Sequence, residues 1–411
     1  MATIKPFRAV RPASGLEPEI ASLPYDTFNR AEAKEYFKDH DKTFLKIDMA
    51  EALFPDDVDN YDEKVYQKAR EIYNEKLSDR EFVKDDKACF YLYEQTMNGR
   101  AQTGLVCCAS VLDYENNIIL KHENTRAEKE KDRITHVDTL NAQTGPIFLA
   151  YREDKSLNAL YKKIKENKPY TEFSNNDVLQ KCWIIDKDED ISFITDTFSN
   201  IPNLYIADGH HRCAAACKVS KMRREACGKY DPDKEYNYFL SVIFSDSELM
   251  IMDYNRVVKD LNDLTEDEFL DKISSSFNIR EIPISDNKPC KKGQIYMFLS
   301  DKEYEICLKD ELLSNDPIKS LDVSVLQDHL LNPVLKIEDP KTDPRIDFVG
   351  GIRGVKELRK RMTEDAAVAF SMYPTSMNEL FNVADAGLLM PPKSTWFEPK
   401  LLSGLFIHEL D

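Results

Sequence analysis

The stretch NLYIADGHHRCAAACKVSK, which runs from Asn203 to Lys221, joins an apolar segment to an Asp-Gly pair, two histidines and an arginine. Residues 204–207 predict a strand, and the alanine-rich run after the histidines predicts a helix. The first N–H groups of a helix have no acceptor within the helix, so they attract anions. Gly209 would let a phosphate approach the backbone, and Arg212 would add a forked pair of donors. The sequence therefore predicts an anion site at this strand-to-helix turn.

The polar side chains of this turn allow several roles. His210 and His211 could donate to phosphate oxygens or move a proton near neutral pH. Asp208 stands where an N-cap residue is expected. Alternatively, Asp208 holds Mg²⁺ or orients a hydroxyl group, because a carboxylate beside a phosphate usually needs a cation between them. His210, Cys213 and Cys217 share one helix face and could bind zinc, although no fourth ligand is evident and the cysteines fit core packing.

A second charged cluster is the stretch KHENTRAEKEKDRITHVDTLNAQTGP, from Lys121 to Pro146. A solvated helix with ion pairs is the ordinary explanation of such a run. The position of its first residues directly after a predicted strand, and the uncharged turn NAQTGP at its end, favour a substrate or phosphate role instead. We expect this helix to approach the turn described above. The residues expected to contribute are His122, Glu123, Arg126 and Arg133.

Three weaker candidates lie outside these clusters. Asp26 precedes a predicted helix and serves either as its cap or as a general base. The glycines of Gly350–Gly354 lie between a strand and a helix, where they form either an anion-binding nest or a plain turn. The proline-bounded loop of residues 393–400, with two lysines, hydroxyl groups and a tryptophan, faces a ligand or docks on the core. Its expected ligand-binding residues are Lys393, Ser394 and Thr395.

Composition and missing motifs narrow the class of protein. The chain has 411 residues, 42% of them apolar, and a formal net charge of −18. This charge disfavours DNA and acidic membranes as partners, so we expect neither nucleic acid nor a membrane. Nine cysteines without regular spacing, and no recognisable signal peptide, predict reduced thiols in a cytoplasmic protein. The P-loop, GxSxG and HExxH motifs are absent, which leaves the reactions that depend on them unsupported.

Helices alternate with hairpins along the chain, which favours an α+β fold over a doubly wound sheet. Asn98-Gly99 predicts a hairpin turn, and residues 294–308 predict a second hairpin. Residues 236–244 and 249–253 are expected to pair as antiparallel strands. We expect three regions. Residues 1–262 form a catalytic region with KHENTR and DGHHR, and residues 263–322 form a helix with a hairpin. Residues 323–411 form a C-terminal α/β region that packs back on the site.

The pentapeptide DGHHR, residues 208–212, resembles the signature of the ParB/sulfiredoxin-like superfamily, in which free L-serine kinases make O-phospho-L-serine. Nearly the whole chain also resembles a long bacterial family mostly labelled as a domain of unknown function. The recurring runs of that family appear here as KHENTR, NAQTGP, DGHHR, YNRVV and MPPKSTWFEPK. The resemblance implies a ParB/sulfiredoxin-like mixed core with hairpins, long insertions and an additional C-terminal α/β region.

The resemblance also implies roles for individual residues. The donor phosphates would bind at Gly209, His210, His211 and Arg212. Asp208 would then lie near Mg²⁺ or the serine hydroxyl group. The kinases use a glutamate near the chain start as the base, and this sequence offers Asp26 there, one methylene shorter.

These observations predict a phosphotransferase that acts on a small hydroxyl metabolite. L-serine is the expected acceptor and phosphoserine the product, or the reverse, with Mg²⁺ and with ATP, ADP or pyrophosphate as the donor. The catalytic residues would be Asp208, His211 and Asp26. Two other functions use the same anion site: a ParB-like nucleotide-binding or DNA-associated regulatory protein, and a small-anion sensor without enzymatic activity.

Overall fold

The structure, a computed structural model, describes residues 1–125, 127–228 and 230–411. It forms two compact units, one of Met1–Leu249 with Pro399–Asp411 and the other of Met250–Glu398. The sequence had led us to expect three regions with boundaries near residues 262 and 322. The final residues belong to the first unit because they pair with its N-terminal part, as in the bridge between Val10 and Ile407.

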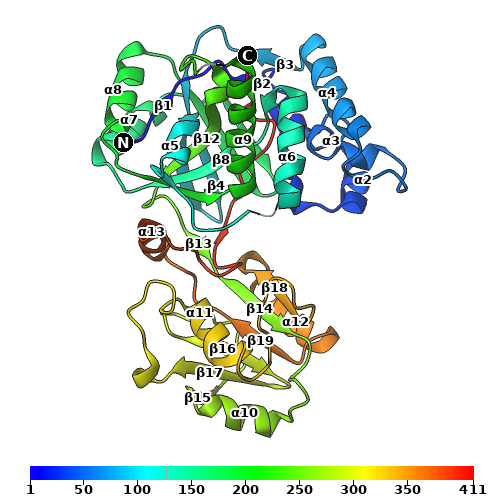
Figure 1. Cartoon of the computed structure of the whole chain (residues 1–411), viewed down its shortest axis with the longest axis vertical. Coiled ribbons are helices and arrows are strands. Elements are labelled where there is room, and N and C mark those ends of the chain that lie inside the picture. Colours follow the sequence, from blue (N-terminus) through cyan, green and yellow to red (C-terminus); the bar gives the residue numbers. More distant parts are fainter. Residues whose placement is uncertain (126, 229) are drawn as a thin grey trace. The chain divides into compact units, whose positions relative to one another are not determined.

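The first unit is built on a nine-stranded mixed sheet (Figure 1). Its strands are β1 (Ile4–Lys5), β4 (Phe90–Met97), β5 (Arg100–Ser110), β6 (Ile119–Leu120), β8 (Ile147–Tyr151), β9 (Thr171–Asn175), β10 (Val178–Ile185), β11 (Leu204–Asp208) and β12 (Tyr238–Ser245). The order is β6-β11-β8-β12-β5-β4-β10-β9, with β1 paired to β5. β11 runs parallel to β6 and antiparallel to β8. The carboxyl ends of β6 and β11 therefore lie at the same edge of the sheet.

Helices and short strands surround this sheet. They are α1 (Glu17–Ile20), η1 (Tyr25–Thr27), α2 (Arg30–Asp39), α3 (Leu45–Asp48), η2 (Ala50–Leu53), α4 (Glu63–Ser78), α5 (Val111–Glu115), α6 (Ala127–Leu140), α7 (Lys155–Lys165), α8 (Asp188–Phe198), α9 (His210–Cys227), η3 (Glu235–Asn237), β2 (Val10–Pro12), β3 (Phe82–Lys84), β7 (Ala142–Gln143) and β21 (His408–Glu409). α9 packs against α6, β8 and β12 (Figure 1). Cys213, Ala216 and Cys217 of α9 are buried in the core that covers the sheet. The small side chains in this stretch thus let the helix lie close to the strands.

Local signals explain where several elements begin. The β4–β5 hairpin turns at Asn98 and Gly99, which have positive φ angles of 52° and 78°, as predicted from the Asn-Gly pair. α2 begins after Asn29, whose side chain accepts the N–H of Glu32 while the Glu32 carboxylate accepts the N–H of Asn29. The expectation that Asp26 caps this helix is wrong, because Asn29 occupies the cap position and Asp26 lies earlier, in η1.

The second unit has its own six-stranded sheet, in the order β15-β17-β16-β19-β14-β18. Its elements are β13 (Ile251–Met252), β14 (Tyr254–Val258), α10 (Glu266–Ser274), β15 (Phe277–Ile282), β16 (Ile295–Leu299), β17 (Lys302–Leu308), η4 (Asp310–Leu312), α11 (Asp322–Leu326), η5 (Gln327–Leu331), β18 (Ile346–Gly350), η6 (Gly351–Arg353), α12 (Gly354–Glu364), β19 (Val368–Ser371), α13 (Met377–Asp385) and β20 (Trp396–Phe397). The predicted second hairpin is confirmed by the antiparallel pairing of β16 and β17. The two sheets and their helices confirm the α+β class.

One predicted pairing is wrong. β12 does not pair with the strand that follows it, because β5 and β8 flank it on its two sides. The following strand, β13, pairs instead with β20, near the other end of the chain. Local sequence predicted the strands but not the partner, because a nonlocal strand competes for each edge. None of the helices in the described ranges combines the length and apolar character needed to cross a bilayer.

Candidate active site

The parallel pairing of β6 and β11 brings two sequence motifs to one edge of the first sheet. Leu204 pairs with Ile119 and Tyr205 with Leu120, so the residues that follow the two strands are neighbours. The ring of His122 packs edge-on against the ring of His210, with 4.6 Å between their centroids. KHENTR and DGHHR therefore meet in space, although they lie far apart in the chain.

The turn between β11 and α9 has a left-handed glycine at its centre. Gly209, rather than Asp208, is the N-cap residue, with φ 90° and ψ 30°. Its N–H donates to Oδ1 of Asp208 over 2.8 Å. The hydrogen bonds of α9 begin with the N–H of Cys213, which donates to the carbonyl oxygen of Gly209 over 2.9 Å. The N–H groups of residues 210–212 lie before the start of that ladder, as expected for an anion site at a helix start.

Asp208 is held by Lys400, the last residue of the proline-bounded loop that the sequence marks as a weaker candidate. Nζ of Lys400 donates to Oδ2 of Asp208 over 3.1 Å. Burial by itself would raise the pKa of Asp208, but the charges of Lys400 and Arg212 and the hydrogen bonds from Lys400 and Gly209 hold it well below the usual range. Asp208 is therefore ionised throughout the neutral range. The pairing of Lys400 with Asp208 was not predicted, because the two residues lie far apart in the sequence.

Arg212 links the turn to the NAQTGP segment. Its Nη1 donates to the carbonyl oxygen of Pro146 over 2.6 Å. A Cβ atom at Gly209 would lie 3.2 Å from Nε of Arg212, and one at Gly145 would lie 3.1 Å from Nη1. The guanidinium thus lies against two glycines, where a larger residue would have to displace it. This packing fixes a positive charge beside the start of α9.

His122 and His210, whose rings meet edge-on, are both neutral at physiological pH. His122 is 1% exposed and His210 is 8% exposed. Burial lowers the pKa of His122 to about 4. Burial, together with His122, lowers the pKa of His210 well below its usual value. We had expected His210 to donate to phosphate or to move a proton near neutral pH, and this environment favours the first role. His211, which is half-buried, stays the predicted catalytic histidine.

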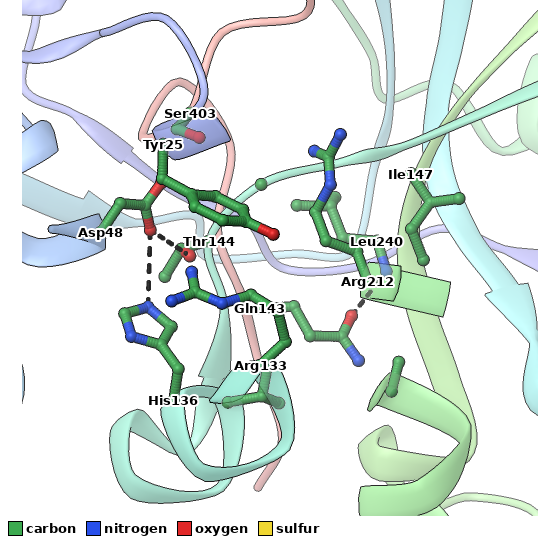
Figure 2. Close-up of a pocket in the computed structure, with 13 residues that line it drawn as sticks. Tyr25, Asp48, Arg133, His136, Gln143, Thr144, Ile147, Arg212, Leu240 and Ser403 are labelled. Carbon is green, nitrogen blue, oxygen red and sulfur yellow. Dashed lines mark hydrogen bonds and ion pairs between the residues drawn. The ribbon is translucent and has the colours of Figure 1, made fainter. Parts of the chain in front are cut away.

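A small cavity adjoins the turn and shares Arg212 with it (Figure 2). Its free volume of about 30 Å³ would hold roughly two water molecules. Figure 2 shows Asp48, Thr144 and His136 gathered on one side and the apolar side chains of Ile147 and Leu240 on the other. The lining residues are Tyr25, Asp48, Arg133, His136, Val137, Gln143, Thr144, Gly145, Ile147, Arg212, Ala216, Leu240 and Ser403.

Arg133 brings a buried positive charge to this cavity. Its guanidinium lies against the ring of Tyr25 (Figure 2), 4.0 Å from the ring centre. Its Nε donates to Oδ2 of Asp132 over 2.8 Å. Burial raises the pKa of Tyr25 to about 12, although Arg133 opposes the shift. Tyr25 therefore stays a neutral phenol at physiological pH. The sequence predicted that Arg133 binds phosphate or substrate, and in the structure it lines the same cavity as Arg212.

The carboxylate of Asp48 organises the polar side of the cavity. It accepts the hydroxyl of Thr144 over 3.0 Å and faces Nε2 of His136 at 3.4 Å. Burial opposes ionisation, but His136, Arg133 and Ser403 lower the pKa of Asp48. Sequence reasoning missed this group. One signal was present, because His136 follows Arg133 by three residues and so shares its helix face.

Two carboxylates near this region are candidates for a general base. Asp26 is exposed in η1, next to Tyr25 in the chain. Glu51 in η2 is half-buried, and burial raises its pKa, although its own backbone hydrogen bond and Arg133 oppose the shift. Glu51 was not predicted, because no local motif surrounds it.

Four of the predicted residues lie outside the described part of the first unit. Arg126 lies outside the described residues. Lys393, Ser394 and Thr395 belong to the second unit, where the hydroxyl of Ser394 is buried and donates to the carbonyl oxygen of Pro391 over 2.7 Å. Their role as ligands stays a prediction.

The glycine-rich turn at residues 350–354 fits packing better than an anion nest. A Cβ atom at Gly350 would lie 2.8 Å from the Trp396 ring, and one at Gly351 would lie 2.4 Å from Oδ1 of Asp253. The space beside these glycines is therefore filled by other side chains. This packing favours a plain turn over an anion-binding nest at residues 350–354.

The donor atoms do not fit a metal held by the protein itself. Among the described residues, no group of three or more His, Cys, Asp or Glu side chains could hold a metal ion. The oxygens of Asp208, the residue predicted to hold Mg²⁺, already accept hydrogen bonds from Gly209 and Lys400. Burial also raises the pKa of Cys217 well above its usual value, which disfavours the thiolate that zinc would need.

Comparison with known proteins gives a family without an established activity. A family model described as "Protein of unknown function (DUF1015)" matches residues 4–324. No curated protein matches the chain.

Three of the similar solved structures have low TM-scores. A mutant free serine kinase in complex with ADP has a TM-score of 0.34 and 14% identity, covering 68% of this chain and 84% of that one. A conserved hypothetical protein from Pyrococcus furiosus has a TM-score of 0.33 and 14% identity, with 70% and 91% covered. C-terminally truncated SbnI from Staphylococcus aureus has a TM-score of 0.36 and 10% identity, with 72% and 85% covered. Similarity this distant assigns no activity.

Proposed function

The chain belongs to the DUF1015 family, and we propose that it is a phosphotransferase that acts on a small hydroxyl metabolite, with L-serine as the first candidate acceptor. The resemblance of DGHHR to the pentapeptide of free L-serine kinases supports this acceptor. ATP, ADP and pyrophosphate are the candidate donors, and the reverse reaction is equally open to this chemistry.

One observation carries the proposal: the start of α9 combines several features that bind a phosphate. The N–H groups of residues 210–212 precede the hydrogen bonds of the helix, the guanidinium of Arg212 lies against Gly209, and the buried, neutral imidazole of His210 follows it. Phosphoryl transfer needs mainly positioning and charge stabilisation, and such a site provides both without a covalent intermediate. The phosphates of the donor would lie at this turn.

The acceptor would bind next to the turn, with its polar groups directed toward the cavity that Arg133 and Arg212 line. The general base, Asp26 or Glu51, takes the proton of the acceptor hydroxyl. The acceptor oxygen then bonds to the terminal phosphorus of the donor as the bond to the bridging oxygen breaks, and the electron pair leaves with the shortened donor. His211 would donate a hydrogen bond to the phosphoryl group in transit. Mg²⁺ would be carried by the phosphates of the donor, in keeping with its usual ligands.

The direct test is incubation with L-serine, Mg²⁺ and each donor in turn, with phosphoserine detected by ³¹P NMR. We expect turnover with one of the donors, and its loss in Asp208→Asn and His211→Ala. Asp26→Asn and Glu51→Gln separate the two candidate bases. Asp154→Asn is the matched control, because Asp154 caps α7 by accepting two backbone N–H groups in the same unit.

Two binding measurements, made beside the turnover assay, separate the other two functions. Phosphate binding without turnover under any donor would indicate an anion sensor. Salt-sensitive binding of a DNA duplex would indicate the regulatory alternative, which the charge of −18 disfavours. Unchanged turnover in both the Asp208 and His211 variants would refute the assignment of the site.

A further inference from the structure

The C-terminal strap, residues 399–411, holds Lys400 in a fixed place within the first unit. The carbonyl oxygen of Lys400 accepts the side-chain amide of Gln95 over 2.9 Å, and Gln95 is fully buried. Further along, the backbones of Ser403 and Ser22 exchange hydrogen bonds of 2.9 and 3.2 Å. The N–H of Gly404 donates to the carbonyl oxygen of Thr144 over 3.1 Å. Lys400 therefore reaches Asp208 from an ordered backbone.

The positive charge of Lys400 offsets the negative charge of Asp208 at the turn. An anion that binds at the start of α9 would lie close to the ionised carboxylate of Asp208, and the two negative charges would repel each other. The Lys400 ammonium, 3.1 Å from Oδ2 of Asp208, cancels that charge. Arg212 then leaves the turn with a net positive charge, to which the helix start adds. Both side chains of the ion pair are partly shielded from water, so salt screens their interaction only in part.

We propose that Lys400 is a positioning residue of the phosphate site: it neutralises Asp208, in the place where a metal ion would otherwise be needed, so that an anionic phosphate can bind at the start of α9. This inference rests on the proposed function only in that both place a phosphate at this turn. It names the C-terminal strap as part of the site and removes the protein-held Mg²⁺ from it. Asp208 and Lys400 act as one unit, whose net charge is near zero.

The test is the affinity for inorganic phosphate and for ADP, measured by calorimetry without metal at low salt. Lys400→Gln should weaken both by about 10-fold or more, because it exposes the anion to the charge of Asp208. Lys400→Arg should keep most of the affinity. The double variant Asp208→Asn with Lys400→Gln should recover affinity to within a few-fold of the wild type, since it removes both charges.

A matched control separates the effect of the Lys400 charge on phosphate binding from its effect on the attachment of the C-terminal strap. Lys84→Gln removes another ion pair between the strap and the body of the unit, the 2.6 Å contact of Lys84 with Glu409. This variant should bind phosphate like the wild type. Thermal unfolding of each variant checks that the fold is intact, and the double variant keeps the test decisive if Lys400→Gln alone is less stable.

Three results would overturn the inference: unchanged phosphate affinity in Lys400→Gln, a double variant as weak as the single one, or tight Mn²⁺ binding by the wild-type protein that Asp208→Asn abolishes. None of these measurements depends on turnover. If phosphate binding follows the predicted pattern but no donor yields phosphoserine, the proposed function fails while the role of Lys400 stands. If phosphoserine forms but phosphate binding does not depend on Lys400, the role of Lys400 fails while the proposed function stands.

Discussion

Asp208 in the first unit and Asp322 in the second are both aspartates at a helix start that accept the N–H of a glycine. Asp208 precedes α9 and accepts the N–H of Gly209, and Asp322 begins α11 and accepts the N–H of Gly293 over 3.0 Å. Their pKa values nevertheless move in opposite directions. The pKa of Asp208 lies well below the usual range, whereas burial raises the pKa of Asp322 to about 6.

The difference comes from the charges that surround each carboxylate. Lys400 and Arg212 outweigh the burial of Asp208. At Asp322, burial raises the pKa, the hydrogen bond from Gly293 lowers it, and the negative charge of Glu379 raises it further. An aspartate at a helix start that accepts the N–H of a glycine is therefore compatible with a charged binding site and with a buried structural contact. Tertiary partners decide between the two.

The largest expected effect is the loss of turnover in Asp208→Asn. We expect a decrease on the order of 10²-fold or more, because the variant loses the carboxylate charge that would orient the acceptor hydroxyl group. The asparagine oxygen still accepts the N–H of Gly209, so the cost to stability should be about 1 kcal/mol or less. Phosphoserine formation and thermal unfolding, measured on the same preparation, check both values.

The pH dependence of this effect follows from the lowered pKa of Asp208. A carboxyl group with a lowered pKa in the folded state adds stability above its unfolded pKa and loses it only as the pH falls through the folded value. The stability difference between Asp208→Asn and the wild type should therefore stay constant from pH 5 to 8. A difference that changes steeply within this range would contradict the ion pair with Lys400.

Asp322→Asn should show the opposite behaviour. A carboxyl group with a raised pKa adds stability below its unfolded pKa of about 4 and loses it as the pH rises through about 6. Relative to the variant, the wild type should lose on the order of 2 kcal/mol of unfolding free energy between pH 4 and pH 8. Trp396, in a Trp183→Phe background, reports unfolding of the second unit by fluorescence, because the chain has two tryptophans. Turnover should not change.

The two glycines provide a matched pair with a smaller effect. Gly209 and Gly293 have φ angles of +90° and +83°, so alanine at either position should cost about 1 kcal/mol of stability from backbone strain. Only Gly209→Ala brings a Cβ atom within 3.2 Å of Arg212. Phosphate affinity, measured by calorimetry, should therefore fall in Gly209→Ala and stay unchanged in Gly293→Ala. Equal losses in both would show that a general loss of stability, rather than the position of Arg212, lowers the phosphate affinity.

Glu379→Gln should have the smallest effect. Glutamine can still accept the N–H of Ser376 in the capping box of α13, so the helix start is retained. Removing the negative charge should lower the pKa of Asp322, with a change in free energy of less than about 1 kcal/mol. The midpoint of the pH titration of stability should move toward lower pH. A movement toward higher pH would show that Glu379 acts through its ion pair with Lys292 instead.

Much of the fold could be predicted from local sequence, since periodicity and turn residues act over short distances. The helix at residues 127–140, the Asn98-Gly99 hairpin and the strand before Asp208 all follow from such patterns. The pairing of β13 with β20 could not be predicted, and the C-terminal region was expected to pack back on the site but with neither the bounds of the strap nor its partners. These contacts join segments far apart in the chain, where competing partners differ little in local propensity.

The sequence by itself determined that a polar, glycine-containing turn joins a buried strand to a helix, and that Arg212 and the histidines stand at its start. Only the tertiary structure decided the charges of those groups. Burial keeps His122 and His210 neutral, and Lys400, brought by the C-terminal strap, keeps Asp208 ionised and paired. The physical reason is that backbone conformation depends mainly on neighbours in the chain, whereas desolvation and Coulomb interactions depend on neighbours in space.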